Sequence, residues 1–442
     1  MNKKQITIFE HEKIFLEKEG IFLSEKDVFA LEKFNSNFYK KTRVEPISLE
    51  YKKGKVVAIK AKNYVGIIKV KNKSFQIIPK LSREARESKE YSRQAIRNLL
   101  FMLTFTKKIK IKESELAGLN KVNDDFFETL IYLFAQNLLS LIKNNINKEY
   151  IDLEDNLNFL KGKINFTGNI KKNSASSNKF YVCYEEFCED NLLNQIFKFT
   201  TVSLLKITKN GYNAKILQEL SFLFDNVTFK KITESDFQKI KLDRLNSFYE
   251  PVLNLAKIFI TNSSLEVRSN NIDTFTFVFD MNELFEDFIT ELTKKIFFGT
   301  EYSVKAQHSI GHLVMKKNGK EKKLFKMLPD IKIFKNKKET PLVIIDTKYK
   351  ITEEDARDGV KQGDMYQMFA YSKKSLCSQV ILLYPRLDIQ KEEDVRFELG
   401  DGVNVYKKTV NLCRELKSRE ERIALKEELK SIYFVEGIMS SS

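Results

Sequence analysis

The sequence predicts an α/β protein with a β-rich N-terminal region, a helical middle and a C-terminal α/β domain. Apolar and polar residues alternate in short segments before residue 80, apolar residues recur at helical spacing between 91 and 150, and strand-like and helical segments follow one another after 270. A chain of 442 residues also exceeds the size of most single cores. The predicted domains are residues 1–115, 116–268 and 269–442.

The N-terminal region is expected to be mostly β. Its clearest strand candidates are residues 54–60 and 64–79, in which apolar and polar residues alternate. Polar residues 71–74 divide the second segment, which predicts a hairpin that ends at Pro79.

The middle region is expected to be helical. Residues 124–147 predict one long amphipathic helix, because their Leu and Phe residues recur three and four positions apart. Helical patterns return at 191–205 and 248–259. Between them, residues 161–180 predict a short strand followed by a polar loop.

Strand-like and helical segments alternate in the C-terminal region. The predicted helices are residues 281–297, 357–374 and 404–434. The predicted strands are residues 273–279, 324–334 with an interruption at Pro329, 342–345 and 379–384. Residues 324–334 and 342–345, joined by a polar turn, predict a hairpin.

The basic composition indicates which kinds of partner the chain could bind. The net charge of +16 favours an anionic partner, either nucleic acid or a membrane surface, although a Lys- and Asn-rich composition also arises from AT-rich coding. No run of about 18 apolar residues occurs, so no membrane span is expected. The N-terminus lacks a signal peptide, and the four cysteines form no CxxC pair, which together predict a cytoplasmic protein without a zinc site or disulfide framework.

Two carboxylates and a lysine form the pattern that carries chemistry. Side chains alternate along a strand, so Asp346 and Lys348 should share one face while Thr347 points to the other. Asp330, on the neighbouring strand, should reach the same end of the sheet. Carboxylate oxygens suit Mg²⁺, and a lysine beside them can orient a water or stabilise a phosphate. As a bare pattern this is weak, and the alternative is a simple ion pair.

The surrounding helices strengthen this interpretation. Glu283 and Glu286 share one face of the helix before the strands, and Gln367 and Tyr371 lie one turn apart on the helix after them. The order helix, strands, helix, strand is that of the αβββαβ core of PD-(D/E)xK nucleases. The sequence therefore predicts a metal-dependent DNA endonuclease.

Two further features bear on this prediction. Residues 305–338 are rich in lysine and poor in acids, which suits DNA phosphates, although a solvated hairpin is the alternative. No GxxxxGK[ST] loop occurs, so nucleotide hydrolysis is expected of a partner. A metal site at His308 and His312 is less favoured than a chance pairing.

The sequence resembles McrC, the nuclease subunit of McrBC-type modification-dependent restriction systems. The segments that carry the resemblance are YVGIIKVKNKSFQIIPKL (64–81), NLLFML (98–103), KGKINF (161–166), EDNLLNQIFK (189–198), FDMNELFEDFI (279–289), LPDIKIF (328–334), IIDTKYK (344–350) and DMYQMFAYS (364–372). The resemblance covers most of the chain, and its C-terminal motifs are the more specific ones.

The resemblance implies a role for each site residue. Asp330, Asp346 and Lys348 match the catalytic triad of the family. Glu286 matches the acidic residue of the preceding helix, with Glu283 the less favoured choice, so the implied metal ligands are Asp330, Asp346 and Glu286. Gln367 and Tyr371 match the QxxxY helix that supports such sites. The implied cofactor is Mg²⁺, with Mn²⁺ as a substitute.

The resemblance also implies partners. These are double-stranded DNA and a McrB-like AAA+ GTPase hexamer, which the chain is expected to bind through its N-terminal region and to stimulate. Two alternatives remain at this point. The chain could be a LlaJI-type subunit that reads an unmodified sequence, or a non-catalytic adaptor that activates an AAA+ motor.

Overall fold

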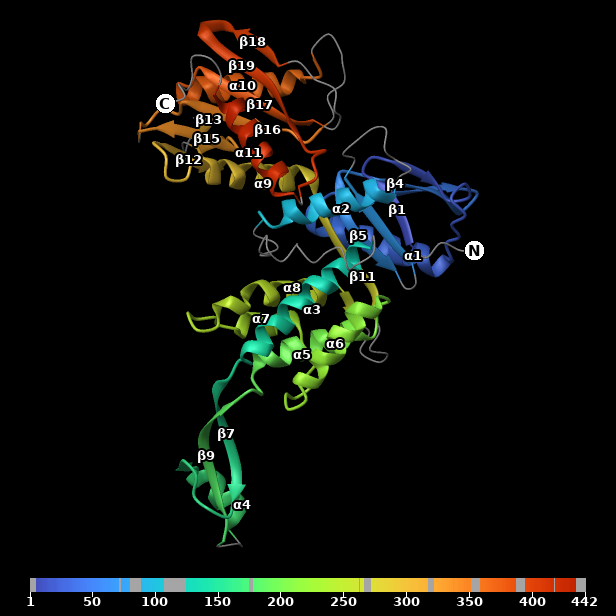
Figure 1. The fold of residues 1–442 in the computed structure, drawn as a ribbon, viewed down its shortest axis with the longest axis vertical. Helices are drawn as coiled ribbons and strands as arrows, with labels where there is room; N and C mark the ends of the chain where they lie inside the picture. Colours follow the sequence, from blue (N-terminus) through green and yellow to red (C-terminus); the bar gives the residue numbers. More distant parts are fainter. Residues whose placement is uncertain are drawn as a thin grey trace. The chain divides into compact units, whose positions relative to one another are not determined.

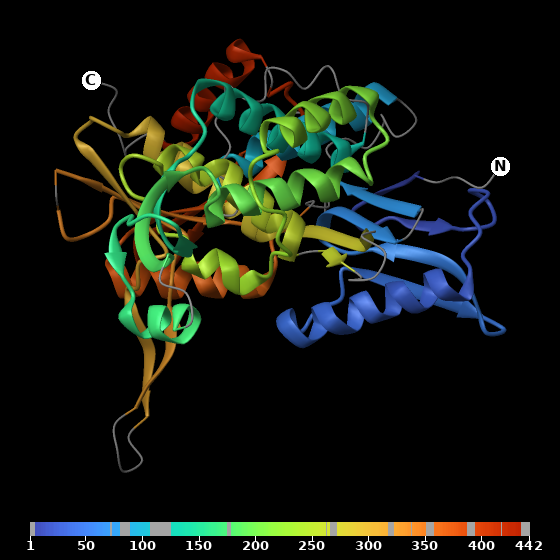
Figure 2. The same cartoon turned by 90° about the horizontal axis from the view of Figure 1, so that it is seen from below.

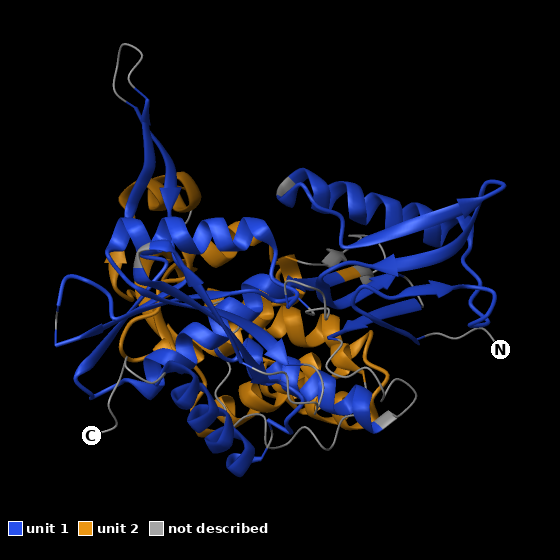
Figure 3. Ribbon diagram, turned by 90° about the horizontal axis from the view of Figure 1, so that it is seen from above, with its two compact units in different colours: residues 1–117, 276–442 blue, residues 118–275 orange. Residues whose placement is uncertain are grey.

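The computed structural model describes residues 5–70, 73–79, 89–106, 125–174, 178–261, 263–265, 272–316, 322–336, 338–350, 358–386, 394–416 and 418–434. The chain forms two compact units, residues 1–117 with 276–442 and residues 118–275 (Figure 3). The mixed α/β character and the β-rich N-terminal region agree with the sequence, while the three predicted domain boundaries stay a prediction. The predicted turn at 71–72 and the start of the helix predicted at 357 lie outside the described residues.

The N-terminal part of the first unit contains two sheets. The first has the order β1-β6-β5-β11 and comprises β1 (Gln5–Phe9), β6 (Lys73–Ile78), β5 (Tyr64–Val70) and β11 (Ile272–Asp280). The second has the order β2-β4-β3 and comprises β2 (Lys13–Phe15), β4 (Lys55–Ala61) and β3 (Ile47–Lys52). β5 and β6 pair antiparallel, so the predicted hairpin is confirmed. Both strands are buried at every position, including the polar residues Lys73, Ser74 and Gln76 of β6.

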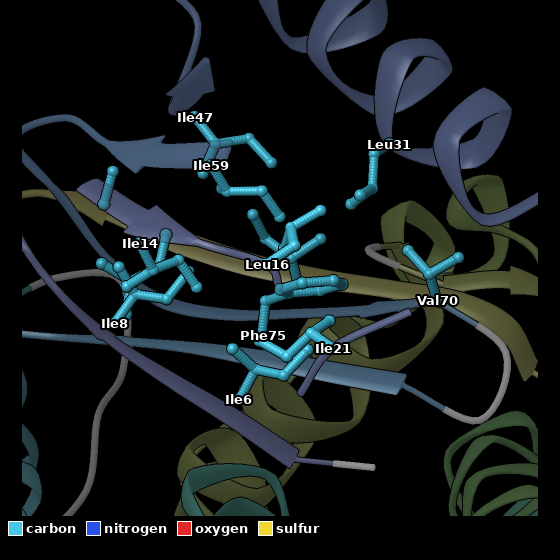
Figure 4. Close-up of a cluster of buried hydrophobic side chains, with 13 residues drawn as sticks. Ile6, Ile8, Ile14, Leu16, Ile21, Leu31, Ile47, Ile59, Val70 and Phe75 are labelled. Carbon is cyan, nitrogen blue, oxygen red and sulfur yellow. The ribbon is translucent and has the colours of Figure 1, made fainter. Parts of the chain in front are cut away.

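Helix α1 (Glu25–Thr42) adds to this part an element that the strand patterns did not predict. Only a narrow stripe of α1 is buried, with Leu31 at its centre, so its helical period is faint in the sequence. Its start is nevertheless encoded, because Ser24 and Asp27 form a capping box. Leu31 packs with side chains of both sheets, including Ile8, Ile59 and Phe75 (Figure 4). Helix α2 (Lys89–Leu103) completes the region.

The second unit is mainly helical, as predicted. Its helices are α3 (Phe126–Asn144), α5 (Leu192–Leu205), α6 (Gly211–Leu223), α7 (Glu234–Lys239) and α8 (Glu250–Thr261), with the 3-10 turn η2 (Ser247–Tyr249) before α8 (Figure 1). The long predicted helix is confirmed as α3, whose N-cap is Asp125. Phe127 of α3 packs edge-on against Phe259 of α8, so aromatic contacts hold the helices together. The short strand β10 (Ser263–Leu265) pairs with the first residues of β11.

A hairpin extends from these helices (Figure 1). It comprises β7 (Glu149–Leu157), β9 (Phe180–Cys188), the short β8 (Lys163–Ile164) and helix α4 (Phe166–Asn173). The prediction of a polar loop after the strand is therefore wrong for residues 166–173. Asn165 caps α4 by accepting a hydrogen bond from the Gly168 backbone, a local signal that the polar composition obscured.

The C-terminal part of the first unit is built on a mixed sheet of six strands. Their order is β12-β15-β16-β17-β19-β18, namely β12 (Tyr302–Ala306), β15 (Ile331–Lys335), β16 (Val343–Thr347), β17 (Gln379–Arg386), β19 (Val403–Asn411) and β18 (Val395–Leu399). β15 and β16 pair antiparallel, which confirms the predicted hairpin, and β17 lies parallel to both β16 and β19. β13 (Gly311–Lys316) and β14 (Lys322–Met327) form a separate two-stranded ribbon, which projects at the bottom of Figure 2.

Helices pack onto this sheet. Helix α9 (Met281–Ile296) contacts β12 and β16, and α11 (Arg419–Tyr433) contacts β19 and α9. Helix α10 (Gln362–Ser375) places Met368 and Tyr371 in a core with Ile344, Val380 and Leu382. Since Ile344 lies on β16 beside the candidate site, this core fixes α10 over it. The 3-10 turn η3 (Gly400–Gly402) joins β18 to β19.

The prediction of a single charged helix over residues 404–434 is wrong. Residues 403–411 form strand β19, which lies between β17 and β18, and only residues 419–433 are helical. The Glu/Lys pairs that suggested a long helix belong to α11. In β19 the consecutive lysines hide an apolar strand, and Lys408 is paired with Asp394.

Gly66 of β5 lies where β5 closely approaches β11. Its φ is +133°, and a Cβ there would lie 2.0 Å from the carbonyl oxygen of Phe277. Because backbone atoms cannot move aside cheaply, we expect Gly66→Ala to lower the free energy of unfolding by about 2–4 kcal/mol in urea denaturation. Gly211→Ala is the control, since a Cβ at Gly211 meets open space. Equal stability of the two variants would contradict this packing.

Candidate active site

Asp330 and Asp346 lie side by side on neighbouring strands. Ile331 pairs with Ile345 across β15 and β16, so the register brings Asp330 opposite Asp346 at the end of the two strands. Their like charges interact, and the charge of Asp330 helps to raise the pKa of Asp346. The structure thus brings together two carboxylates that are separated by 15 residues in the sequence.

Thr347 orients the Asp330 carboxylate. One oxygen of Asp330 accepts hydrogen bonds from the Thr347 backbone N–H at 2.7 Å and from its hydroxyl at 2.8 Å. Burial raises the pKa of Asp330 although these two bonds act to lower it. The expectation that Thr347 points away from the site is wrong, because β16 ends at this residue and the hydroxyl turns to Asp330.

Asp346 is the most enclosed group of the site, with 1% of its surface exposed. The Lys348 ammonium lies 2.6 Å from its Oδ2. Burial, followed by the charge of Asp330, raises the pKa of Asp346 to about 7, although Lys348 opposes this. The carboxylate is therefore held in a place where its negative charge is under-compensated.

Lys348 is positioned by a chain of polar contacts from α10. Its ammonium donates to Gln367 Oε1 at 3.2 Å, the Gln367 amide donates to the Tyr371 hydroxyl at 2.8 Å, and that hydroxyl donates to the Leu328 carbonyl at 3.2 Å. Burial acts to lower the pKa of Lys348, but the charge of Asp346 outweighs it and the pKa is raised. Lys348 is therefore an ammonium at neutral pH.

Glu286 of α9 approaches the site from another direction. Its Oε1 accepts a hydrogen bond of 2.7 Å from the Gln307 amide, and the Gln307 backbone N–H donates to the Asp330 carbonyl. Burial and then the charge of Asp330 raise the pKa of Glu286 to about 7. Glu283, by contrast, is exposed and acts on the pKa of Tyr64. The structure thus places Glu286 nearer to Asp330.

The two strand carboxylates fit a hard divalent ion. Mg²⁺ takes one or two protein carboxylates and fills its remaining positions with waters and phosphate oxygens. Across the described part of the chain, no group of three His, Cys, Asp or Glu side chains is arranged to hold a metal. Asp330 and Asp346 are therefore the two carboxylates that could hold a metal ion together. A third metal ligand at Glu286 stays a prediction.

Three residues contribute to this site in ways that the sequence interpretation did not predict. Thr347 and Gln307 act through the contacts described above, and Asp364 of α10 pairs with Lys350 and adds to the negative charge around Asp346. Asp364 begins the DMYQ motif and could have been found by its helical spacing to Gln367. Gln307 has no such signal, because its place depends on how β12 meets β15.

The lysine-rich stretch and the two histidines of the sequence analysis lie on and beside the β13–β14 ribbon and strand β15. Lys316, Lys322, Lys323 and Lys326 are exposed on the β13–β14 ribbon. His308 contacts the Lys332 ammonium at 3.2 Å rather than His312.

In the described segments, no helix has the length and apolar character needed to cross a lipid bilayer.

Known restriction-system proteins resemble this chain in sequence. A family model described as McrBC 5-methylcytosine restriction system component matches residues 59–385. The chain is also similar to the type IV methyl-directed restriction enzyme EcoKMcrBC of Escherichia coli (strain K12). The two are 24% identical over 341 residues, which cover 72% of this chain and 93% of that protein.

Two solved structures resemble the chain. The refined half-complex from a tetradecameric assembly of Thermococcus gammatolerans McrB AAA+ hexamers with bound McrC matches with a TM-score of 0.75 and 23% identity, covering 97% of this chain and 100% of that chain. The cryo-EM structure of the Thermococcus gammatolerans McrBC complex matches with a TM-score of 0.52 and 28% identity, covering 66% and 88% respectively. At 23% identity, the first likeness establishes a shared fold.

The raised pKa of Asp346 gives a stability prediction. The folded chain binds the Asp346 proton more tightly than the unfolded chain, so its stability is greatest below the ordinary aspartate pKa and falls as pH rises toward about 7. Asp346→Asn removes this loss. Since one pKa unit corresponds to about 1.4 kcal/mol, we expect the variant to be about 1–4 kcal/mol more stable than the parent at pH 8 without divalent ions.

Urea denaturation at pH 8 and pH 5 in a chelator measures this effect, and the difference between variant and parent should shrink at pH 5. Asp155→Asn, at an exposed carboxylate of β7, is the control and should change little at either pH. A variant that is no more stable than the parent at pH 8 would show that Asp346 carries no uncompensated charge.

Proposed function

Because the chain belongs to the family of McrBC 5-methylcytosine restriction system components, as its resemblance to McrC indicated, we propose that it is the Mg²⁺-dependent DNA endonuclease subunit of such a system. The observation that carries the proposal is the pairing of Asp330 with Asp346 and the 2.6 Å contact of Asp346 with Lys348. The chain order of α9, β12, β15, β16, α10 and β17 further supports a nuclease domain of the PD-(D/E)xK type.

The metal ion in this proposal is held by Asp330 and Asp346. When bound, Mg²⁺ would neutralise charge that develops on the scissile phosphate. The pKa values of both carboxylates are raised, chiefly by burial, so a bound cation would favour their ionised forms. Thr347 fixes the Asp330 oxygen through two hydrogen bonds, so this ligand is oriented before the ion arrives. Mn²⁺ shares the preference for oxygen ligands and is the expected substitute.

Lys348 serves as an electrostatic group in this proposal. Because its pKa is raised, it holds its proton and can stabilise negative charge on the phosphate or orient the attacking water, rather than accept a proton. Gln367 and Tyr371 hold its ammonium in place. Glu286, whose pKa is near neutrality and which lies beside Asp330, is suited to accept a proton or to serve as a further ligand.

The partner in this proposal is a McrB-like AAA+ GTPase hexamer. The Thermococcus gammatolerans assembly contains McrB AAA+ hexamers with bound McrC, and its match spans 97% of this chain. The sequence itself has no GxxxxGK[ST] loop, so hydrolysis would belong to the partner. We propose that the N-terminal region makes this contact and that the chain stimulates the partner's hydrolysis.

Asp346→Ala tests the catalytic part of the proposal. In the complex reconstituted with the partner GTPase and Mg²⁺, we expect cleavage of 5-methylcytosine-containing DNA to fall by more than about 100-fold, because a metal ligand is lost. Stimulation of GTP hydrolysis should persist, since it does not depend on the carboxylate. Glu291→Gln on α9, whose side chain pairs with Lys294, is the control and should cleave like the parent.

The outcomes separate the alternatives. Cleavage that persists in Asp346→Ala would sink the endonuclease assignment and leave the chain as an adaptor that activates an AAA+ motor. Equal cleavage of methylated and unmethylated DNA by the parent would instead favour a LlaJI-type subunit that reads an unmodified sequence.

A further inference from the structure

A buried lysine lies next to the two carboxylates on the same strand pair. Lys332 lies on β15 two residues after Asp330, which immediately precedes the strand, so strand alternation places both residues on one face of the sheet. Only 3% of the Lys332 surface is exposed. Its cross-strand partner on β12 is Lys305, and its ammonium lies 3.2 Å from His308 Nδ1.

These basic groups converge on one spot. The ammonium of Lys305 lies 4.9 Å from the centre of the Phe334 ring and that of Lys332 lies 5.8 Å from it. Both lysines therefore direct their charges over the same aromatic side chain. Lys305 and His308 are exposed, so the spot is open to solvent although Lys332 itself is covered.

Lys332 and its cross-strand partner Lys305 differ from two nearby lysines that have a counter-ion. Lys335 pairs with Glu301 at 3.2 Å, and Lys348 pairs with Asp346 at 2.6 Å. Within the described residues, neither Lys305 nor Lys332 lies within ion-pair distance of a carboxylate. Among the described residues, the polar side chain that contacts the Lys332 ammonium is that of His308, which carries no negative charge.

This arrangement costs stability in the absence of a ligand. The buried Lys332 ammonium has lost hydration that its contacts with His308 and the Phe334 ring replace only in part. Two lysines paired across strands also repel each other. An anion at the spot would relieve both costs at once, because it would screen the repulsion and supply the missing hydrogen-bond acceptors.

We infer that Lys305, Lys332 and His308 form a subsite for a phosphodiester phosphate of the DNA strand, next to the one that the carboxylates address. The inference rests on the proposed function. Residues two apart on a strand are separated by about 6.6 Å, so a strand running along β15 can present one phosphate at Asp330 and another at Lys332. The exposed lysines of the β13–β14 ribbon continue the positive surface beyond this subsite.

Lys332→Met tests the subsite, because methionine keeps the apolar stem and removes the charge. It is measured in the full chain on the Asp346→Ala background, so that a short methylated duplex is bound and not cut. We expect weaker binding and a slope of log K against log salt that is shallower by about 1, since one phosphate contact is lost. The melting temperature should stay equal or rise, because an uncompensated buried charge is removed.

Lys335→Met is the matched control. It removes one positive charge from the same strand, but Lys335 already has Glu301 as its partner. We expect its salt slope to equal that of the Asp346→Ala parent. An unchanged slope in Lys332→Met, or an equal loss in both variants, overturns the subsite, because bulk charge would then explain the binding.

Two further outcomes identify the source of the phosphate and keep the two proposals apart. GTP could raise the melting temperature of the parent chain but not that of Lys332→Met, while the slope of log K for DNA against log salt is the same in both. In that case the phosphate belongs to a nucleotide, and the DNA assignment is overturned. If the slope depends on Lys332 but the intact complex never cleaves DNA, the subsite stands and the endonuclease function fails.

Discussion

Two aspartates from adjacent strands are kept within reach of each other in a buried place, and the rest of the site depends on this constraint. The pairing of Ile331 with Ile345 fixes it, because a shift of one residue would turn one carboxylate to the other face of the sheet. Like charges repel strongly where water is excluded. Burial raises the pKa values of both Asp330 and Asp346, and the charge of Asp330 adds to the rise at Asp346. The Thr347 hydrogen bonds oppose the rise at Asp330, and Lys348 opposes it at both carboxylates.

The strand that carries Asp346 is also anchored beyond the site. Tyr349, which follows Lys348, donates a buried hydrogen bond of 2.6 Å to Glu10 at the end of β1, and its ring packs against Phe285 of α9. Asn98 of α2 donates to the carbonyls of Leu412 and Arg414 after β19. The N-terminal and C-terminal parts of the first unit are thus joined by buried polar contacts, which limit motion of the strand that carries Asp346.

The sequence predicts where the strand carboxylates and the polar residues of the following helix lie, because both placements depend on local periodicity. Asp346 and Lys348 alternate on a strand, and Gln367 and Tyr371 lie one helical turn apart, so spacing alone placed them. The sequence did not predict the contacts of Thr347, Gln307 and Lys332, because these contacts depend on neighbouring strands. The sequence predicts a helix where strand β19 lies, because the lysines of β19 mask an apolar run that is buried only through its pairing with β17. Tertiary contacts, which no local pattern encodes, decided each of these cases.

We propose that Asp330 and Asp346 together hold one divalent ion. Anomalous scattering from crystals of the chain soaked in Mn²⁺ can locate this ion. We expect a single strong peak within coordination distance of both carboxylates, which disappears in crystals of Asp330→Asn. A strong peak elsewhere in the chain, or none at this place in well-ordered crystals, would contradict it.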